Sequence, residues 1–382
     1  MTYWRRVSLS LFVVCFGTNV STPLLLVYRE RLHLSDAVLT TIFGAYAAGL
    51  VPAILFSGPI SDRLGRRRVT VPFVALAGLS TALFVPAADH EWLLYLARFL
   101  QGVVSGVVFS VATAWLAELS GPGHHQAAGR RAAVAMTLGF SLGPLTSGAL
   151  GQWAPAPTVL PYVVHLVLLV AGVGALIGVP ETLSARATGP LLRIRLRPGT
   201  ARTFWVLVAP TAVCVYAFPS VAITVVPLFL PRHAHQIAFT GLVGGLTLGS
   251  GTVAALSAGR LGSRAAAFGV TMGALGYTAC AVALGQADQA LALVGAGLLG
   301  VGNGLALAAG LALTHRLADP LARGSLTSVF YGLAYLGFAA PYVVAELAAR
   351  TSGAIALAAL AGLSALLGLW LAAKWNPMSL RL

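Results

Sequence analysis

Hydrophobic residues run along nearly the whole chain in long segments that short polar connections separate. A helix needs about 20 consecutive apolar residues to cross the hydrocarbon layer of a bilayer. Segments of about this length lie at 8–28, 37–57, 69–87, 92–117, 131–151, 159–179, 204–229, 239–258, 267–285, 289–313, 325–347 and 352–373. The pattern therefore predicts an all-α integral membrane protein with twelve transmembrane helices.

The longest polar interval divides the chain into two parts of similar length. Residues 180–203 separate an N-terminal six-helix bundle, 1–179, from a C-terminal six-helix bundle, 204–382, and are expected to form a cytoplasmic central loop. Six helices followed by six in the same orientation indicate a parallel repeat, with a pseudo-two-fold axis along the membrane normal. Such repeats are expected to place a substrate site near the middle of the membrane, between the halves.

Short sequences recur at the same place in each half. Arg63-Leu64-Gly65 follows the second predicted helix, and Arg260-Leu261-Gly262 follows the eighth. Pro144 lies in the fifth predicted helix and Pro341 in the eleventh, at the same spacing as the first pair. The recurrence supports an internal repeat.

The composition excludes an ordinary water-soluble protein. Only 9% of the 382 residues are charged and 58% are hydrophobic, whereas soluble domains contain about 25% charged residues. The formal net charge of +14 could suggest a nucleic-acid partner, but nucleic-acid binders gather basic residues on a solvated face. Here they stand in short clusters between apolar segments, so we expect a lipid bilayer as partner and no nucleic acid.

The positions of the basic residues predict the orientation in the membrane, because Lys and Arg favour cytoplasmic loops. With the N-terminus inside, only four of the 24 basic residues fall on the outer side and one falls within a helix. The outer ones are Arg29, Arg31, Arg232 and Arg350, and the one within a helix is Arg98. We therefore expect a multi-pass protein of the inner (cytoplasmic) membrane, with both termini cytoplasmic.

The connection between the second and third predicted helices carries a distinctive motif. It reads Gly58-Pro59-Ile60-Ser61-Asp62-Arg63-Leu64-Gly65-Arg66-Arg67-Arg68. Gly58 is expected to let the second helix approach a neighbour, and Gly65 to permit a tight turn. Asp62 can pair with arginines or cap a helix N-terminus.

Two further motifs lie inside predicted helices. The fourth contains Arg98-Phe99-Leu100-Gln101-Gly102, with Arg98 about 10 Å along the helix if it begins at Glu91. An intramembrane arginine is costly and is expected to face the protein interior. The fifth contains Gly139, Gly143, Pro144 and Gly148 at helical spacing, which permits close helix packing.

Together these motifs resemble the signatures of the major facilitator superfamily, and Pro180-Glu181-Thr182 is a common companion. The Arg98–Gly102 motif is similar to that of proton-coupled members, and the fifth-helix motif to that of antiporters. The resemblance is to the drug:proton antiporter and arabinose efflux permease branch. It implies a secondary active transporter rather than an enzyme, with a conformational switch loop made of Gly58, Asp62, Arg63, Gly65, Arg66 and Arg67.

From this resemblance we expect proton-coupled efflux of a small amphipathic or sugar-like compound by rocker-switch alternating access, with a role in drug resistance. We expect the protein to act as a monomer. One alternative is a uniporter or importer of a small metabolite. Another is a membrane receptor that transports nothing.

The usual carrier for proton coupling is missing, because no acidic residue falls in the middle of a predicted helix. Many related antiporters carry a carboxylate in the first helix, where this chain has Asn19. The candidates for coupling are Arg98, Gln101, Gly102, Glu118, His165 and Glu346. A chain without such a carboxylate also favours the uniporter alternative.

Polar and aromatic residues within predicted helices are the candidates for substrate binding. They are Asn19, Tyr46, Tyr216, Asn303, Tyr331 and Tyr335. Tyr331 and Tyr335 are one helical turn apart and could equally form an aromatic packing stripe. The three cysteines lie far apart within apolar segments, so we expect no metal site, and no motif calls for a cofactor.

Overall fold

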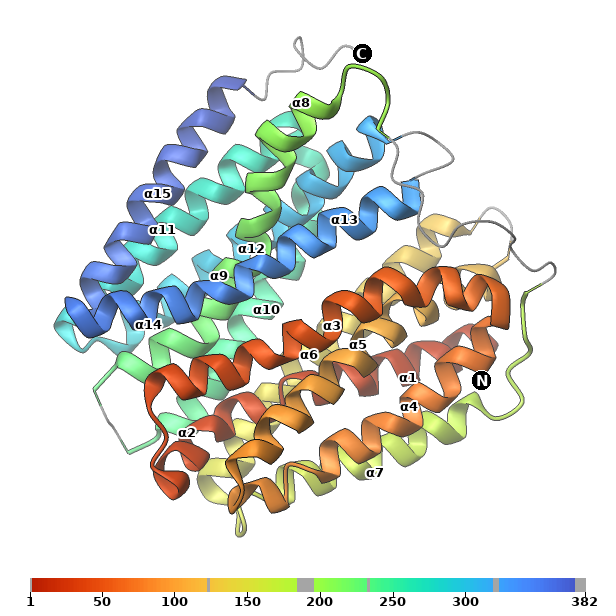
Figure 1. The fold of residues 1–382 in the computed structure, drawn as a ribbon, viewed down its shortest axis with the longest axis horizontal. Coiled ribbons are helices and arrows are strands. Elements are labelled where there is room, and N and C mark those ends of the chain that lie inside the picture. The colour runs from red at the N-terminus through yellow and green to blue at the C-terminus, as the bar shows by residue number, and fades with distance from the viewer. Residues whose placement is uncertain (1, 122–123, 184–195, 232–233, 319–322, 375–382) are drawn as a thin grey trace. The chain divides into compact units, whose positions relative to one another are not determined.

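The computed structural model describes residues 2–121, 124–183, 196–231, 234–318 and 323–374. These residues form helices joined by short connections (Figure 1), and one isolated backbone bridge links Leu196 with Ala318. The all-α class predicted from the hydrophobic pattern is confirmed. Residues 184–195 of the predicted central loop lie outside the described residues.

The chain forms two compact units. The first comprises residues 1–192 together with 237–245, and the second comprises 193–236 and 246–382. The helices of the first unit are α1 (Tyr3–Thr18), α2 (Ser21–Leu32), α3 (Asp36–Leu64), α4 (Arg66–Ala82), η1 (Pro86–Ala88), α5 (Glu91–Leu119), α6 (His125–Trp153) and α7 (Leu160–Leu176). The predicted domain limits at 179 and 204 stay a prediction.

The second unit begins with α8 (Ala201–Thr203) and a π-helical turn, η2 (Phe204–Val208). Then follow α9 (Ala209–Phe229), α10 (Gln236–Leu261), η3 (Gly262–Arg264), α11 (Ala265–Gln286), α12 (Gln289–Leu317), α13 (Arg323–Tyr335), η5 (Leu336–Ala339), α14 (Ala340–Arg350) and α15 (Gly353–Lys374). The first part of α10, residues 237–245, packs with the first unit.

By length and composition, ten helical stretches of the described chain can cross a membrane. One of them, Gln236–Gln286, is 51 residues long and contains both α10 and α11, and α7 is a shorter apolar helix of 17 residues. Each of the twelve predicted segments therefore corresponds to helical structure. The number of crossings stays a prediction.

The predicted loop between the second and third segments is largely helical, which corrects the sequence interpretation. Helix α3 continues to Leu64 and α4 begins at Arg66, so that Gly65 is the only residue between them. Its φ of 111° lies in the region that favours glycine. The predicted boundary was too early because hydropathy falls after Ser57, whereas a polar segment can continue a helix beyond the hydrocarbon layer.

Proline interrupts two of the predicted helices. Residues Asn19 and Val20 form a turn between α1 and α2, and Pro23 explains the interruption because its ring clashes with the carbonyl four residues earlier, at Asn19. Pro341 acts in the same way on Gly337, which lies in the 3-10 turn η5 between α13 and α14. By contrast, α6 runs through Pro144 without a break.

Close helix packing in the first unit depends on particular glycines. A Cβ at Gly102 would overlap the carbonyl oxygen of Tyr46, and one at Gly143 would overlap that of Phe16. A Cβ at Gly58 would lie 3.4 Å from Ser110 Oγ, with no other atom within 4 Å. The expected close approach of α3 to its neighbour α5 is therefore made at Gly49, Gly102 and Gly106, and not at Gly58.

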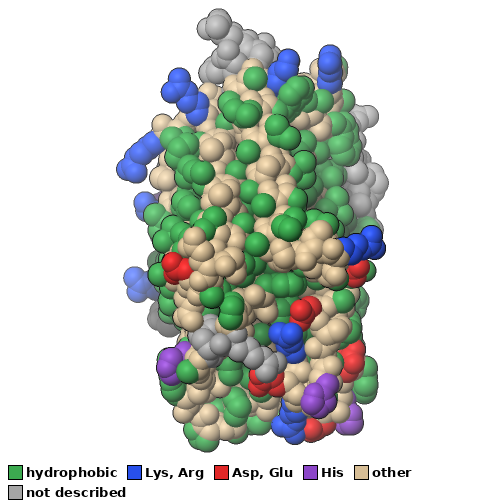
Figure 2. All heavy atoms as spheres, turned by 90° about the vertical axis from the view of Figure 1, so that its left-hand side faces the viewer, with side chains coloured by type: hydrophobic (Ala, Val, Ile, Leu, Met, Phe, Trp, Pro, Cys, Tyr) green, Lys and Arg blue, Asp and Glu red, His purple; other side chains and the backbone are tan. Residues whose placement is uncertain are grey.

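Apolar side chains also cover much of the surface. Figure 2 shows one face on which hydrophobic side chains predominate, with several Lys and Arg side chains towards its upper end. Large exposed aromatic residues mark helix ends: Trp92 near the start of α5, Trp153 at the end of α6 and Trp370 near the end of α15. Because tryptophan prefers the boundary between membrane and water, this distribution fits a membrane-embedded protein.

Candidate functional site

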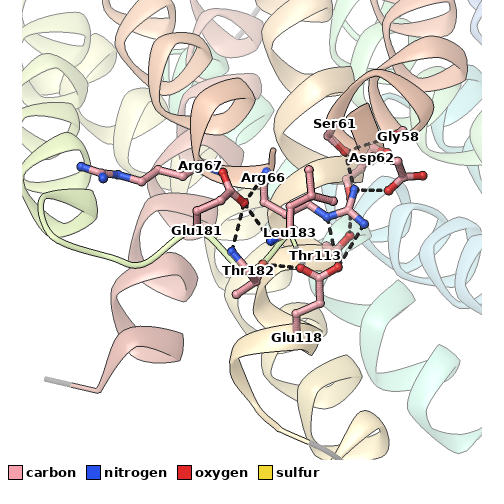
Figure 3. A network of polar contacts seen from close by, with 11 residues as sticks. Gly58, Ser61, Asp62, Arg66, Arg67, Thr113, Glu118, Glu181, Thr182 and Leu183 are labelled. Carbon is pink, nitrogen blue, oxygen red and sulfur yellow. Dashed lines mark hydrogen bonds and ion pairs between the residues drawn. The ribbon is translucent and has the colours of Figure 1, made fainter. Parts of the chain in front are cut away.

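The junction of α3 and α4 carries an ion-pair network centred on Arg66 (Figure 3). Its guanidinium lies 2.6 Å from Asp62 Oδ1 and 3.0 Å from Glu118 Oε1, and it also donates to Ser61 Oγ. Asp62 stands one turn before Arg66, and Glu118 comes from the end of α5. One arginine therefore joins the ends of three helices.

A second carboxylate caps the N-terminus of α4. Glu181 follows α7, and its two carboxylate oxygens accept hydrogen bonds from the backbone N–H groups of Arg66 (2.8 Å) and Arg67 (3.1 Å). It also accepts from the N–H groups of Thr182 and Leu183. These bonds satisfy donors that a helix N-terminus leaves unpaired. The sequence predicted that Asp62 could cap a helix or pair with arginine, and Asp62 pairs with Arg66.

The electrostatics of Glu181 follow from these bonds. Partial burial acts to raise the pKa of its carboxyl group, but the hydrogen bonds from the four backbone N–H groups outweigh burial and hold the pKa below its ordinary value. The carboxylate form is therefore the one that the α4 terminus stabilises.

The segment after α7 connects this cap to the rest of the network. Trp115 Nε1 of α5 donates to the carbonyl oxygen of Pro180 at 3.1 Å, and the Thr182 hydroxyl donates to Glu118 Oε2. Residues Pro180–Thr182 thus contact α4 and α5 together. From the sequence, Pro180–Thr182 was identified only as a common companion of the family motifs. Nothing local in it indicates that Glu181 caps a helix more than 100 residues away.

A second polar cluster lies around Arg98, near the start of α5, which begins at Glu91 as the predicted position of Arg98 requires. Arg98 is only 1% exposed, and its guanidinium donates to the carbonyl oxygens of Thr18 (3.1 Å) and Phe43 (3.3 Å) and to Gln101 Oε1 (2.9 Å). The cation also lies 5.0 Å from the ring centre of Tyr46. Within the described chain no ion pair is found for Arg98.

This cluster supports the interruption of the first predicted helix. The turn at Asn19 removes helical partners from the carbonyl groups that precede it. Gln101 Nε2 donates to the carbonyl oxygen of Gly17 at 2.7 Å, and Arg98 serves that of Thr18. Arg98 therefore supplies a donor to the carbonyl of Thr18, and Gln101 adds a donor to that of Gly17, which also accepts from the backbone N–H of Val20. Asn19, predicted within a helix, lies in this turn and is half-buried.

His165 of α7 is held on both sides of its ring. Nε2 lies 3.1 Å from the carbonyl oxygen of Val13, which can only accept, so this nitrogen carries the proton. Nδ1 lies 2.9 Å from the hydroxyl of Thr81. The ring also stacks against Phe16. The neutral ring is thus fully hydrogen-bonded, an arrangement suited to joining α1, α4 and α7.

The remaining coupling candidates lie in different surroundings. Glu118 belongs to the Arg66 network, and Glu346 is half-buried in the last turns of α14. Gly102 serves the close contact with Tyr46 described above. Among the described residues, every Asp and Glu lies near a helix end or in a connection.

The fifth-helix motif forms contacts within the first unit. Gly139 and Gly143 face α1, where a Cβ would overlap the carbonyl oxygens of Phe12 and Phe16. Gly148 packs against Gly241 of α10, where a Cβ would meet its Cα. The glycines therefore serve close packing, as their spacing predicts.

In the second unit, two of the three candidate tyrosines come together. The rings of Tyr216 (α9) and Tyr335 (α13) stack with centroids 4.4 Å apart, and their hydroxyl groups are 3.4 Å apart. Tyr331, one turn before Tyr335, packs against the same hydrophobic core as Tyr216. The structure therefore brings these tyrosines into a local aromatic cluster, and their role in substrate binding stays a prediction.

Asn303 of α12 has a defined structural partner. Its Nδ2 donates to the carbonyl oxygen of Val215 at 2.5 Å. In a regular helix that carbonyl would receive the N–H of residue 219, which is Pro219 and has none. Asn303 therefore replaces a proline-deleted hydrogen bond immediately before Tyr216. Sequence spacing alone could not pair these residues, which are 88 positions apart.

Comparison with known proteins places these observations in a family. Residues 7–342 match the sequence profile of the Major Facilitator Superfamily. The multidrug resistance protein MdtL of Escherichia coli O157:H7 is 40% identical over 85 residues, and MdtL of Shigella boydii serotype 18 (strain CDC 3083-94 / BS512) is 39% identical over 85 residues. Each match covers 22% of this chain and 22% of the relative, so only about a fifth of the length of these relatives is matched.

Solved transporters share the fold at low sequence identity. A POT family transporter in complex with 5-aminolevulinic acid has a TM-score of 0.81 and 12% identity, covering 99% of this chain and 96% of that one. A D-xylose–proton symporter has a TM-score of 0.77 and 15% identity, covering 99% and 98%. These likenesses concern the fold.

Proposed function

The chain belongs to the Major Facilitator Superfamily, and from that premise we propose that it is a secondary transporter that exports a small amphipathic or sugar-like compound in exchange for protons. The two six-helix halves alternate access to the substrate by a rocker-switch movement. The protein lies in the cell inner membrane with both termini cytoplasmic and acts as a monomer.

The observation that carries this proposal is the Arg66 network. Arg66 pairs with Asp62 and Glu118 at 2.6 and 3.0 Å, and its own backbone N–H is capped by Glu181. These groups lie at the predicted cytoplasmic ends of their helices. Several charge-assisted bonds on one residue can hold one conformation and break together in another, which is the behaviour that a conformational switch requires.

Two observations support export rather than import. The glycine motif of α6 resembles that of antiporters and packs tightly against α1. The local likeness to MdtL, named as a multidrug resistance protein, points to efflux of a drug-like compound and to drug resistance. Substrate binding is assigned to Asn19, Tyr46, Tyr216, Asn303, Tyr331 and Tyr335.

Proton coupling is assigned to Arg98, Gln101, Gly102 and Glu118 of α5, to His165 of α7 and to Glu346 of α14. Arg98 is a buried cation that donates to carbonyl and amide oxygens. Because a buried charge interacts strongly with other charges, a proton or a substrate group that arrives nearby changes the electrostatic potential at Arg98 strongly. The alternative function is a uniporter or importer of a small metabolite. It is favoured by the position of the described acidic residues near helix ends.

The experiment uses inverted membrane vesicles energised to an acid interior, with a pH-sensitive dye inside. Addition of a transported compound is expected to release protons from wild-type vesicles. Asp62→Asn is expected to lower this release at least about tenfold, because one charged partner of Arg66 is lost and such a bond contributes about 1.5–3 kcal/mol.

The matched control is Asp89→Asn. Asp89 also pairs with an arginine, Arg31 at 2.7 Å, but its side chain is 62% exposed and it lies outside the Arg66 network. Asp89→Asn is expected to keep wild-type release at equal protein levels. Wild-type release in Asp62→Asn vesicles contradicts the switch, and flux of labelled compound without any proton release selects the uniporter.

A further inference from the structure

We propose that the aromatic cluster of Tyr216, Tyr335 and Phe338 binds a planar aromatic ring of an uncharged compound. The inference rests on the proposed transport function and names the chemical class of the substrate.

The three rings lie close together although they come from two segments. Tyr216 of α9 stacks on Tyr335 with an interplanar angle of 23°. Phe338 of η5 lies 5.6 Å from the ring of Tyr216 and 5.5 Å from that of Tyr335. Tyr216 and Phe338 are half-buried, whereas Tyr335 is buried. Tyr216 and Phe338 are thus partly accessible beside the buried Tyr335.

The backbone under the cluster is fixed by close packing. A Cβ at Gly337 would overlap both the backbone nitrogen of Ala217 and the carbonyl oxygen of Val213, so that η5 and α9 touch backbone to backbone. The hydroxyl of Ser220 donates to the carbonyl oxygen of Gly337 at 3.2 Å. The backbone N–H of Ala340 donates to the same carbonyl, and Pro341, four residues later, has no N–H to add.

The other side of the cluster is fixed by Asn303. Its hydrogen bond to the carbonyl oxygen of Val215 holds the residue that precedes Tyr216. The carbonyl groups four residues before Pro219 and Pro341 therefore each accept a hydrogen bond from a side chain of a neighbouring segment. Rings held in this way lose little conformational freedom when a ligand binds, which favours recognition of a rigid, flat partner.

The charge around the cluster favours an uncharged ligand. The described acidic residue of this unit nearest in sequence to Phe338 is Glu346, eight residues and about 12 Å further along the helical path. The other described charged residues of the second unit lie near helix ends or in connections. The tyrosine hydroxyl groups, 3.4 Å apart, give the apolar ring faces one polar edge. An aromatic compound with a hydroxyl or similar neutral polar group matches this surface.

The test compares two probes with the same carbon skeleton and hydroxyl position, one flat and aromatic and the other saturated and puckered. The purified full-length chain is placed in lipid nanodiscs, and its affinities for 2-naphthol and for decahydro-2-naphthol are measured by titration calorimetry. Aromatic pairs contribute about 0.5–1.5 kcal/mol beyond area burial. Wild type is therefore expected to bind 2-naphthol about fivefold more tightly than its saturated analogue.

Three variants identify the source of this preference. Tyr216→Leu is expected to reduce the affinity ratio to about one, while Tyr216→Phe keeps it because the ring remains. The control is Tyr342→Leu, which removes a 43% exposed tyrosine of α14 that lies outside the cluster, and it keeps the ratio. Thermal melting of each variant shows whether it is folded.

Two results would overturn the inference: a wild-type ratio of one, or an unchanged ratio in folded Tyr216→Leu. The vesicle experiment tests transport separately from the preference for an aromatic ligand. Proton release with decahydro-2-naphthol equal to that with 2-naphthol supports transport and refutes the aromatic preference. A fivefold binding ratio without any flux supports the aromatic cluster and refutes transport.

Discussion

Arg66 and Arg98 of the first unit carry their charge in opposite surroundings. Arg66 lies at a helix end between two carboxylates, Asp62 and Glu118. Arg98 is buried and is surrounded by carbonyl oxygens, an amide oxygen and aromatic ring faces. The carboxylate partners of Arg66 are partly exposed, so water can take the place of the arginine when the pairs break, whereas removing the partners of a buried cation is expensive. Arg66 therefore suits a switch, and Arg98 links α5 to the end of α1.

Glu181 gives a prediction for pH dependence at the residue scale. Its pKa in the folded chain lies below the ordinary carboxyl value, so the carboxylate stabilises the fold above that ordinary value, about 4.3. The contribution is lost as the pH falls through the folded pKa. Glu181→Gln is expected to lower stability at pH 7 and pH 5 by about 1 kcal/mol, as for a lost N-cap, and the difference in stability is expected to be smaller at pH 3, below the ordinary carboxyl pKa.

Thermal melting of wild type and Glu181→Gln in nanodiscs at these three pH values measures the difference in stability. Glu91→Gln serves as the control because Glu91 is an exposed glutamate in the first turn of α5, and it is expected to give the smaller difference. Equal melting temperatures of wild type and Glu181→Gln at pH 7 would show that the cap contributes nothing.

At the scale of elements, polar side chains donate hydrogen bonds to carbonyl groups whose helical donor a proline removes. Val215 and Gly337 each precede a proline by four residues, and each carbonyl accepts from a side chain of a neighbouring segment, Asn303 or Ser220. Arg98 and Gln101 likewise donate to the carbonyl oxygens of Thr18 and Gly17 at the turn between α1 and α2. Polar side chains in the spans thus allow helices to bend without leaving buried carbonyl groups unsatisfied.

This pairing predicts a rescue. Asn303→Leu leaves the Val215 carbonyl without its donor and is expected to cost about 1–3 kcal/mol of stability. Adding Pro219→Ala supplies a backbone N–H at the position that a helix requires, so the double variant is expected to recover most of that loss. Melting temperatures of the two single variants and the double variant form a cycle. A double variant no more stable than Asn303→Leu would refute the replacement.

At the scale of the whole molecule, the distribution of charge predicts orientation. The Arg63–Arg68 junction is expected inside and the connection at Asp89–His90 outside. In a chain whose three native cysteines are replaced, His90→Cys is expected to react with a membrane-impermeant maleimide in intact cells. Arg68→Cys, equally exposed, is expected to react only after the membrane is opened. The reverse pattern would invert the assigned topology.

The sequence predicted the helical segments well because membrane helices depend on a local property, the length of an apolar run. It predicted helix ends less well. Helix α3 extends to Leu64 beyond its apolar part, and the first segment is interrupted at Asn19. Both differences have local chemical causes, Gly65 and Pro23, but hydropathy does not register them. Gly65 was correctly predicted to permit a tight turn.

By itself the sequence determined the membrane class, the family and the residue types available for chemistry, because length, hydropathy and motif spacing are read along the chain. Only the tertiary structure decided which of those residues meet. It joined Glu181 to the start of α4, Asn303 to Val215 and Tyr216 to Tyr335. Such pairs depend on helix packing across 80 to 120 positions of sequence, and no local pattern specifies that packing.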